Sequence, residues 1–189
     1  MKISIIIMLL ILQSCGGGST TGNPISTTNV AVSMQDKQPF AWLKYINEAF
    51  ISSAYAAVSN TKFCFKRLRF KPDSITAGSN FDLILGEVTI NPSGVSLLTV
   101  TIPSGTYTRV EFDLEKECDG VAGKPSVIFT NGTGTFSTIE TMTIKFDGVY
   151  VAGADGSLTL DIDSLFDAMD LITANNQIKT ALEAAPGGF

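Results

Sequence analysis

Between Thr61 and Asp163 the chain consists of short runs of strand-forming residues, separated by Gly, Pro, Asn and Asp. Apolar and polar residues alternate along several runs, as in Val110-Phe112-Leu114, which indicates strands with one buried face. No long helical pattern lies between the runs, so βαβ units are excluded. We therefore predict that residues 59–163 form a single antiparallel β-sandwich of the transthyretin or immunoglobulin-like kind. The predicted strands are Lys62–Phe70, Phe81–Ile90, Val95–Ile102, Thr106–Leu114, Ser126–Thr130, Met142–Phe146, Val149–Val151 and Ser157–Ile162.

A short helix is predicted before this domain, over residues 38–58. Apolar residues such as Leu43 and Ile46 recur there at helical spacing. Two interpretations stay open. One is an amphipathic helix that lies on a membrane surface with Trp42 and Tyr45 at the interface, and the other is a helix that packs on its own domain.

A second helix is predicted after the domain, within residues 164–189. Ser164 and Asp167 have the spacing of a capping box, and an apolar face follows them. That face consists of Leu165, Phe166, Met169 and Ile172, and a continuation through Ile178 and Leu182 after a break at Asn175-Asn176 stays open. The tail Pro186–Phe189 is predicted to be loose.

The N-terminus has the pattern of an export signal. Lys2 precedes an apolar run, Ile3–Leu12, that spans only about 15 Å as a helix and is too short for a lasting transmembrane segment. The run ends in Leu12-Gln13-Ser14-Cys15, which resembles the lipobox of bacterial lipoproteins. This resemblance implies a lipoprotein signal peptide over residues 1–14 and acylation of Cys15, palmitate included. The alternative is an ordinary secretory signal with an incidental Cys.

The same resemblance implies the outer membrane as the destination, because Gly16 rather than Asp follows the Cys. Acyl chains on Cys15 would make the membrane a partner of the protein. Whether the domain faces the periplasm or the cell surface stays open. Residues 15–37 are predicted to be the lipidated Cys and a flexible tether, since Gly16–Asn29 is small, polar and turn-rich.

Composition narrows the range of functions. A net charge of −5 at pH 7 argues against a nucleic-acid partner, which needs a basic surface. The sequence contains no His, and so lacks the commonest general base and metal ligand. It also contains neither a nucleophile-elbow motif nor a phosphate-binding loop. We predict no catalytic residue, no metal site and no cofactor.

Cys64 and Cys118 are the thiols of the predicted exported domain. Outside the cytoplasm two such residues pair readily, and the loop-entropy model assigns about 4 kcal/mol to a bond across this separation. Two buried free thiols are the alternative. A redox-active pair is not predicted, because the chain has no Cys-x-x-Cys motif and no His to activate a thiolate.

Two charged stripes lie on the predicted strands. Residues of one parity form the acidic stripe: Glu111, Asp113, Glu115, Glu117 and Asp119. The basic stripe contains Lys62, Lys66, Arg67, Arg69 and Lys71. Calcium for the acidic stripe, and phosphate or polysaccharide for the basic one, are possible ligands. The simpler interpretation is that the stripes face solvent and pair with each other across strands.

A resemblance to a known family covers residues 57–166. The segment Ile102-Pro103-Ser104-Gly105-Thr106-Tyr107-Thr108-Arg109-Val110-Glu111-Phe112 is similar to the signature L-P-A-G-x-Y-x-x-I-R-L of an uncharacterised β-sandwich domain family in bacterial surface lipoproteins. The resemblance implies a fold and a location but no activity. We expect structural roles in a turn for Pro103, Gly105 and Tyr107. Pro103 would end a strand, Gly105 would adopt a positive φ, and the Tyr107 hydroxyl would cap a nearby backbone group.

Together these patterns predict a membrane-anchored bacterial lipoprotein that is a non-catalytic binding or structural module of the cell envelope. Its predicted partners are the membrane and an envelope protein or polysaccharide. The alternative function is an envelope carbohydrate-active enzyme that uses a pair of carboxylates, which requires a concave pocket where the carboxylates converge.

Overall fold

The computed structural model describes residues 26–35, 58–73, 79–81, 84–91, 94–153 and 156–189. Within these residues the chain is mainly β, and eleven strands form one hydrogen-bonded sheet. The order is β5-β1-β10-β11-β9-β6-β2-β7-β8, and β3 and β4 pair with β2. The bounds are β1 Thr27–Gln35, β2 Ser59–Pro72, β3 Ser79–Phe81, β4 Gly86–Ile90, β5 Val95–Pro103, β6 Gly105–Leu114, β7 Val127–Asn131, β8 Gly134–Thr138, β9 Met142–Ala152, β10 Ser157–Asp161 and β11 Gly187–Gly188.

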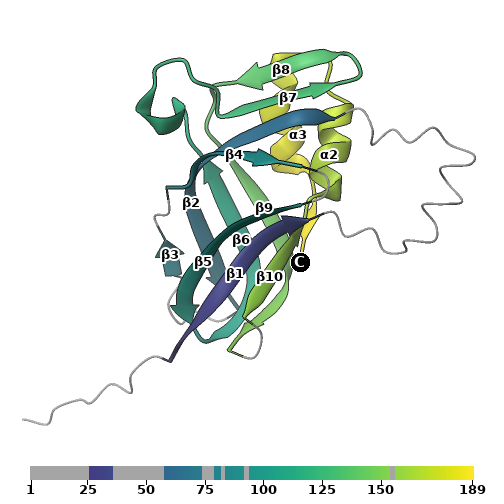
Figure 1. Cartoon of the computed structure of the whole chain (residues 1–189). Coiled ribbons are helices and arrows are strands. Elements are labelled where there is room, and N and C mark those ends of the chain that lie inside the picture. The colour runs from purple at the N-terminus through teal and green to yellow at the C-terminus, as the bar shows by residue number, and fades with distance from the viewer. Residues whose placement is uncertain (1–25, 36–57, 74–78, 82–83, 92–93, 154–155) are drawn as a thin grey trace, which may run out of the picture.

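The sheet curls around one hydrophobic core. In Figure 1, β1, β5 and β10 lie in front of β6 and β9. The buried side chains of Val32 and Met34 on β1 belong to the same cluster as Phe112 on β6 and Phe146 on β9. The rings of Phe112 and Phe146 meet edge to face with centroids 6.0 Å apart. Each such buried side chain contributes about 1.5–3 kcal/mol of transfer free energy. Side chains of β1 and those of β6 and β9 therefore stabilise the curled shape together.

The short strand β11 joins two parts of the sheet. It stands between β10 and β9 in the strand order, antiparallel to β10 and parallel to β9. Strand β1 is also parallel to β10. The sheet is therefore mixed, which differs from the purely antiparallel arrangement that we predict. The predicted loose tail is also wrong, because residues 187 and 188 are hydrogen-bonded in the sheet.

Two α-helices follow β10, where the sequence predicts one with a continuation left open after a break at Asn175-Asn176. They are α2 (Asp163–Asp170) and α3 (Ile178–Ala184), with the 3-10 turn η3 (Asn175–Gln177) between them. Figure 1 shows both helices beside the β7–β8 hairpin. The expected cap is also different. Ser164 makes no capping bond, and the Asp161 carboxylate accepts a hydrogen bond from the Asp163 N–H at 3.0 Å instead.

The N-terminal part of the described chain departs from the predicted tether. Residues 27–35 form β1, which pairs with both β5 and β10. The tether therefore does not extend through residue 37 as predicted. The signal peptide 1–14, Cys15 and nearly all of the predicted helix 38–58 lie outside the described residues, and the helix's last residue, Val58, is buried just before β2. None of the described helices has the length and apolar character to cross a membrane.

Candidate functional site

The outer surface of β2, β6 and β9 carries a cluster of charged side chains, which we call the charged face. The inward residues of these strands are apolar, so strand alternation directs the charged residues outward. The antiparallel register places Arg67 opposite Asp113 and Arg69 opposite Glu111, with Lys145 of β9 on the other side of Glu111. The charged face consists of Arg67, Arg69, Lys71, Arg109, Glu111, Asp113, Lys145 and Asp147.

Arg69 is at the centre of the charged face. Its guanidinium lies 3.1 Å from Glu111 and 3.4 Å from Asp113, measured from Nη1 and Nη2 to the nearest carboxylate oxygens. Arg67 and Lys71 approach the same two carboxylates at 3.7 Å. Glu111 is only 7% exposed, and three cations, those of Arg69, Lys71 and Arg109, lie within 4 Å of its partly desolvated carboxylate.

A shallow cavity of about 450 Å³ opens at one end of the charged face. It is lined by Lys71, Thr108, Arg109, Glu111 and Asp147. The Nε of Arg109 lies 2.5 Å from Asp147, and this hydrogen bond raises the pKa of Arg109. Both carboxylates of the cavity, Glu111 and Asp147, thus form ion pairs with basic side chains. They are not arranged as an unpaired general acid and general base.

A second cavity, of about 740 Å³, lies between α2 and α3. Its lining is mostly small or apolar, with Ala168, Leu171 and Ala181 among the contributing residues, and Asp167 is its single carboxyl group. The first cavity thus contains two carboxylates, both ion-paired, and the second contains one.

The two predicted stripes pair with each other along the second half of β6 and just beyond its end, except that Lys62 pairs with Glu87 of β4. Glu111 and Asp113 bind the β2 arginines, and Glu115 binds Lys66 at 3.0 Å. The acidic stripe ends there. Glu117 and Asp119 do not continue it, because their φ values of 58° and 56° turn the chain away from the strand.

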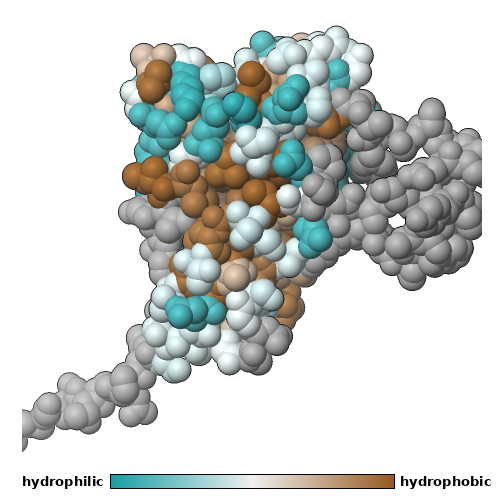
Figure 2. Space-filling view, viewed as in Figure 1, coloured by the Kyte–Doolittle hydropathy of each residue, from teal (hydrophilic) through white to brown (hydrophobic). Residues whose placement is uncertain are grey.

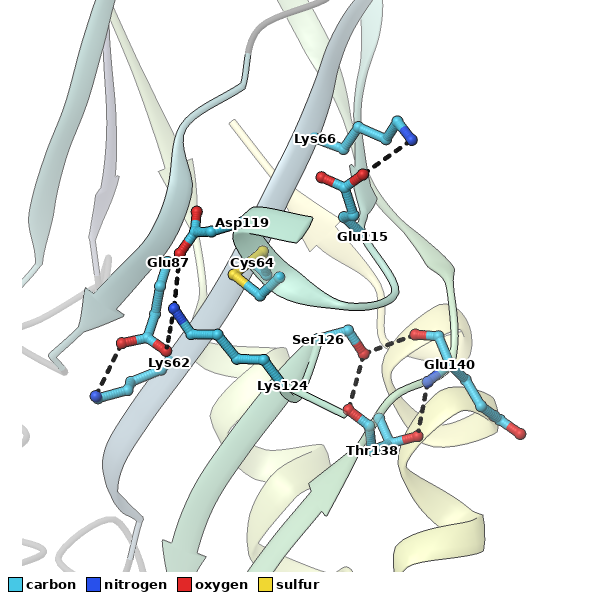
Figure 3. Close-up of a disulfide and its surroundings, with 11 residues drawn as sticks. Lys62, Cys64, Lys66, Glu87, Glu115, Asp119, Lys124, Ser126, Thr138 and Glu140 are labelled. Atoms are coloured by element: carbon cyan, nitrogen blue, oxygen red, sulfur yellow. Dashed lines mark hydrogen bonds and ion pairs between the residues drawn. A yellow bond between two sulfur atoms is a disulfide. The ribbon is translucent and has the colours of Figure 1, made fainter. Parts of the chain in front are cut away.

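That turn is η2 (Cys118–Gly120), and a disulfide attaches it to β2. Cys64 and Cys118 are bonded, with their Cα atoms 5.5 Å apart and both side chains buried (Figure 3). Because the two sulfurs bond each other, the predicted alternative of free thiols does not describe this structure. The disulfide fixes a chain segment that has no regular strand or long helix of its own.

Ion pairs surround the disulfide. Figure 3 shows Lys124 between Asp119 and Glu87, at 2.6 and 3.6 Å, and Lys62 against the other oxygen of Glu87 at 2.9 Å. The hydrogen bond from Lys62 lowers the pKa of Glu87, while the hydrogen bond to Asp119 raises the pKa of Lys124. Gly86 of β4 has a φ of +64°, which favours glycine, and a Cβ there would displace the Asp119 carboxylate, from which it would lie 2.5 Å away.

The three residues of the turn signature lie together at the end of β5. Pro103 is the last residue of that strand, and the buried Tyr107 donates its hydroxyl hydrogen to the Pro103 carbonyl at 2.7 Å. Gly105 differs from the expectation. Its φ is not positive, and a Cβ there would meet no atom within 4 Å, so conformation does not demand glycine at this position.

Asn131 is a structural residue that the sequence analysis missed. It is 5% exposed, and its Nδ2 donates to the carbonyls of Met169 and Ile172 at 2.9 and 2.8 Å, which caps the C-terminal end of α2. Its Oδ1 accepts the N–H of Thr133 and so closes the β7–β8 turn. The Asn-Gly dipeptide signals a turn, but only the folded chain brings α2 to it.

Comparisons of the chain with models of known protein families, with curated proteins and with solved structures find no match.

Proposed function

We propose that the protein is a bacterial lipoprotein, anchored by acyl chains on Cys15 to the outer membrane, and that it is a non-catalytic binding or structural module of the cell envelope. The lipobox-like segment supports the anchor. The Cys64–Cys118 disulfide supports export, because such bonds persist in oxidising compartments and are rare in the cytoplasm.

The proposal includes the finer fold. The inward faces of β1, β5 and β10 pack on the same core as those of β2, β6 and β9. This arrangement is compatible with a sandwich whose two layers are connected at one side. We propose that the curled sheet is a variant of the β-sandwich in the lipoprotein domain family that the turn signature resembles.

The charged face is the observation that carries the binding role. It contains five basic and three acidic residues, so its formal charge is +2 (5 − 3) on a chain whose net charge is −5. Partly or fully exposed cations in excess on one face of an otherwise acidic protein attract an anionic partner and determine which face of the protein binds it. We propose that this partner is an anionic polysaccharide of the envelope.

The anchor is tested by the intact mass of the full chain purified from the membranes of a bacterial host. We expect a chain that begins at Cys15 and carries acyl groups, with alkylation of the two domain cysteines only after reduction. The Cys15→Ser variant should lose both the acyl mass and the membrane fractionation. An unacylated wild-type chain that is cleaved elsewhere overturns the anchor.

The binding role is tested with polygalacturonate as the anionic probe. Lys145→Glu changes the charge of the charged face by two units, and Lys116→Glu makes the same change at an exposed residue outside it. We expect Lys145→Glu to weaken binding severalfold, with a steep salt dependence in the wild type, and Lys116→Glu to have little effect. Equal losses in both variants would show that the overall charge, not this face, attracts the probe, and cleavage of the probe would favour the enzyme.

A further inference from the structure

The C-terminal residues fill a gap in the sheet. Strands β9 and β10 are consecutive in the chain, yet the strand order places β11 between them. The pairing consists of Asp161 with Gly188 on one side, and of Phe146 with Gly187 and Asp147 with Gly188 on the other. Figure 1 marks the C-terminal end of the chain beside β10. This gap is the place where an added strand finds hydrogen-bonding backbone on both of its sides.

The walls of the gap select the side chains of the strand that occupies it. A Cβ on Gly187 would lie 2.5 Å from Cδ1 of Phe146 and 2.8 Å from the carbonyl oxygen of Lys145. A Cβ on Gly148 of β9 would lie 2.8 Å from both the ring and the carbonyl oxygen of Phe189. Glycine at 187 and glycine at 148 are thus both needed, one in the occupant and one in the wall. The site therefore accepts glycine at the position of Gly187 and an aromatic ring at the position of Phe189.

The occupant can leave without unfolding the helix before it. Ile178 and Leu182 of α3 are fully buried in the core and hold that helix independently of the tail. The tail itself is short and half-buried, and Pro186 separates it from α3. Short peripheral segments of this kind open at a much lower free energy than the core. When residues 187–189 leave, β9 and β10 both expose unpaired backbone groups.

We propose that the gap between β9 and β10 is a binding site for an extended peptide segment of another protein, with a glycine two residues before an aromatic residue, and that residues 187–189 occupy it in the isolated chain. The partner strand would add to the sheet by backbone hydrogen bonds, with the aromatic ring over Gly148 as the specificity contact. Because residues 187–189 belong to the same chain as the site, they compete at a high effective concentration. The partner's concentration relative to its dissociation constant must be high enough to displace them. This inference does not depend on the anchor or on the charged face.

The test uses the full chain with Phe189→Ala and a fluorescent hexapeptide of sequence Ala-Ala-Pro-Gly-Gly-Phe. We expect this peptide to bind the variant on the order of tenfold more tightly than it binds the wild type, because the variant's own tail competes poorly. A peptide that ends in Ala instead of Phe should not bind. Absence of binding to a folded Phe189→Ala chain overturns the proposal.

A matched pair of glycine substitutions in the Phe189→Ala background identifies the site. Gly148→Ala should abolish peptide binding, whereas Gly105→Ala, whose Cβ meets nothing within 4 Å, should leave it unchanged. Equal effects of the two substitutions overturn the assignment of the aromatic contact.

A measurement on the unaltered chain covers the case in which Phe189→Ala does not fold. Millimolar peptide should shift the amide NMR signals of the chain's own Gly187, Gly188 and Phe189, because these residues leave the gap when the peptide replaces them. Signals of the sheet edges β5 and β8 should not move. Shifts confined to β5 or β8 would mean that the peptide adds to an open edge, and that result overturns the proposal, as does the absence of any shift.

Discussion

Two regions of the sheet, β1 and β5 at one end and β2, β6 and β9 in the middle of the strand order, have similar inner faces and different outer faces. Strands β1 and β5 contain no charged residue, and their outer contacts join neutral groups, such as Thr101 Oγ1 to Asn29 Oδ1 at 2.7 Å. Figure 2 shows this side mainly in white and brown, with few hydrophilic residues at its centre. On β2, β6 and β9 the outer contacts are ion pairs. Packing constrains the inner faces because they share one core, whereas the outer faces are free to differ.

The difference has physical consequences. Contacts between hydroxyl and amide groups are short-ranged and do not respond to pH, while ion pairs respond to pH and salt. The charged face therefore interacts at a distance and the neutral face does not. Four predictions test how far the two regions differ, in order of decreasing effect.

Loss of the disulfide should have the largest effect. The bond spans 54 residues and is attached to β2 of the charged region, so replacing both Cys64 and Cys118 with Ser should lower the free energy of unfolding by about 4 kcal/mol. Urea denaturation of the two proteins measures the difference, and reductant should not affect the double variant. Because both regions share the core, we expect one transition. Separate unfolding of β1 and β5 would show that the regions are independent.

Loss of the Asn131 amide should come next. Asn131→Ala leaves the buried carbonyls of Met169 and Ile172 without their donor, and we expect a loss of about 2 kcal/mol. Asn29→Ala removes an exposed amide on the neutral face and should cost less than about 0.5 kcal/mol. Thermal unfolding of both variants measures the contrast, and equal losses would contradict the role assigned to burial.

Loss of the central arginine should have a smaller effect. Arg69→Leu removes the closest cation from the nearly buried Glu111, but Lys71 and Arg109 remain within 4 Å of it. We expect a loss of about 1–2 kcal/mol in chemical denaturation. Thr101→Val on the neutral face is the control, with an expected change below about 0.5 kcal/mol. A larger loss in the control would reverse the ranking of the two faces.

The smallest of the four effects is expected for the pH dependence that a single ion pair, Lys62–Glu87, contributes to stability. The hydrogen bond from Lys62 lowers the pKa of Glu87 in the folded state, so this group stabilises the fold above the unfolded-state pKa of Glu. The contribution is lost as the pH falls through the lowered folded-state pKa. Glu87→Gln should therefore reduce the difference in stability between neutral and acid pH. The denaturation midpoint against pH measures it, and an unchanged profile would contradict the pairing.

Strand β6 of the charged region and strand β5 of the neutral region were both predicted to within one residue at each end. Val110, Phe112 and Leu114 alternate with charged residues, so the contrast along β6 is strong, and the observed strand, Gly105–Leu114, nearly coincides with the predicted Thr106–Leu114. The cross-strand pairing of the stripes also follows from residue parity, once the strands are antiparallel neighbours.

Strand β1 of the neutral region was not predicted, because the contrast along it is weak. In β1, Val30, Val32 and Met34 alternate with Thr, Asn, Ala and Ser, which are also typical of a tether. The strand exists because β5 and β10 pair with it on both sides, and these partners lie far away in the sequence. Strand β8 and the short β11 likewise depend on their neighbours.

Alternation and turn residues were sufficient to indicate a mainly β domain, because side-chain period and backbone preference are local properties. The alternation of residues along each strand was also sufficient to place the acidic and the basic side chains on the outer face of the sheet. Local pattern does not contain the order of the strands, the insertion of Gly187 and Gly188 between β9 and β10, or the capping of α2 by Asn131. These depend on which distant segments meet, and the shared core and the close approach of glycine backbone select that arrangement.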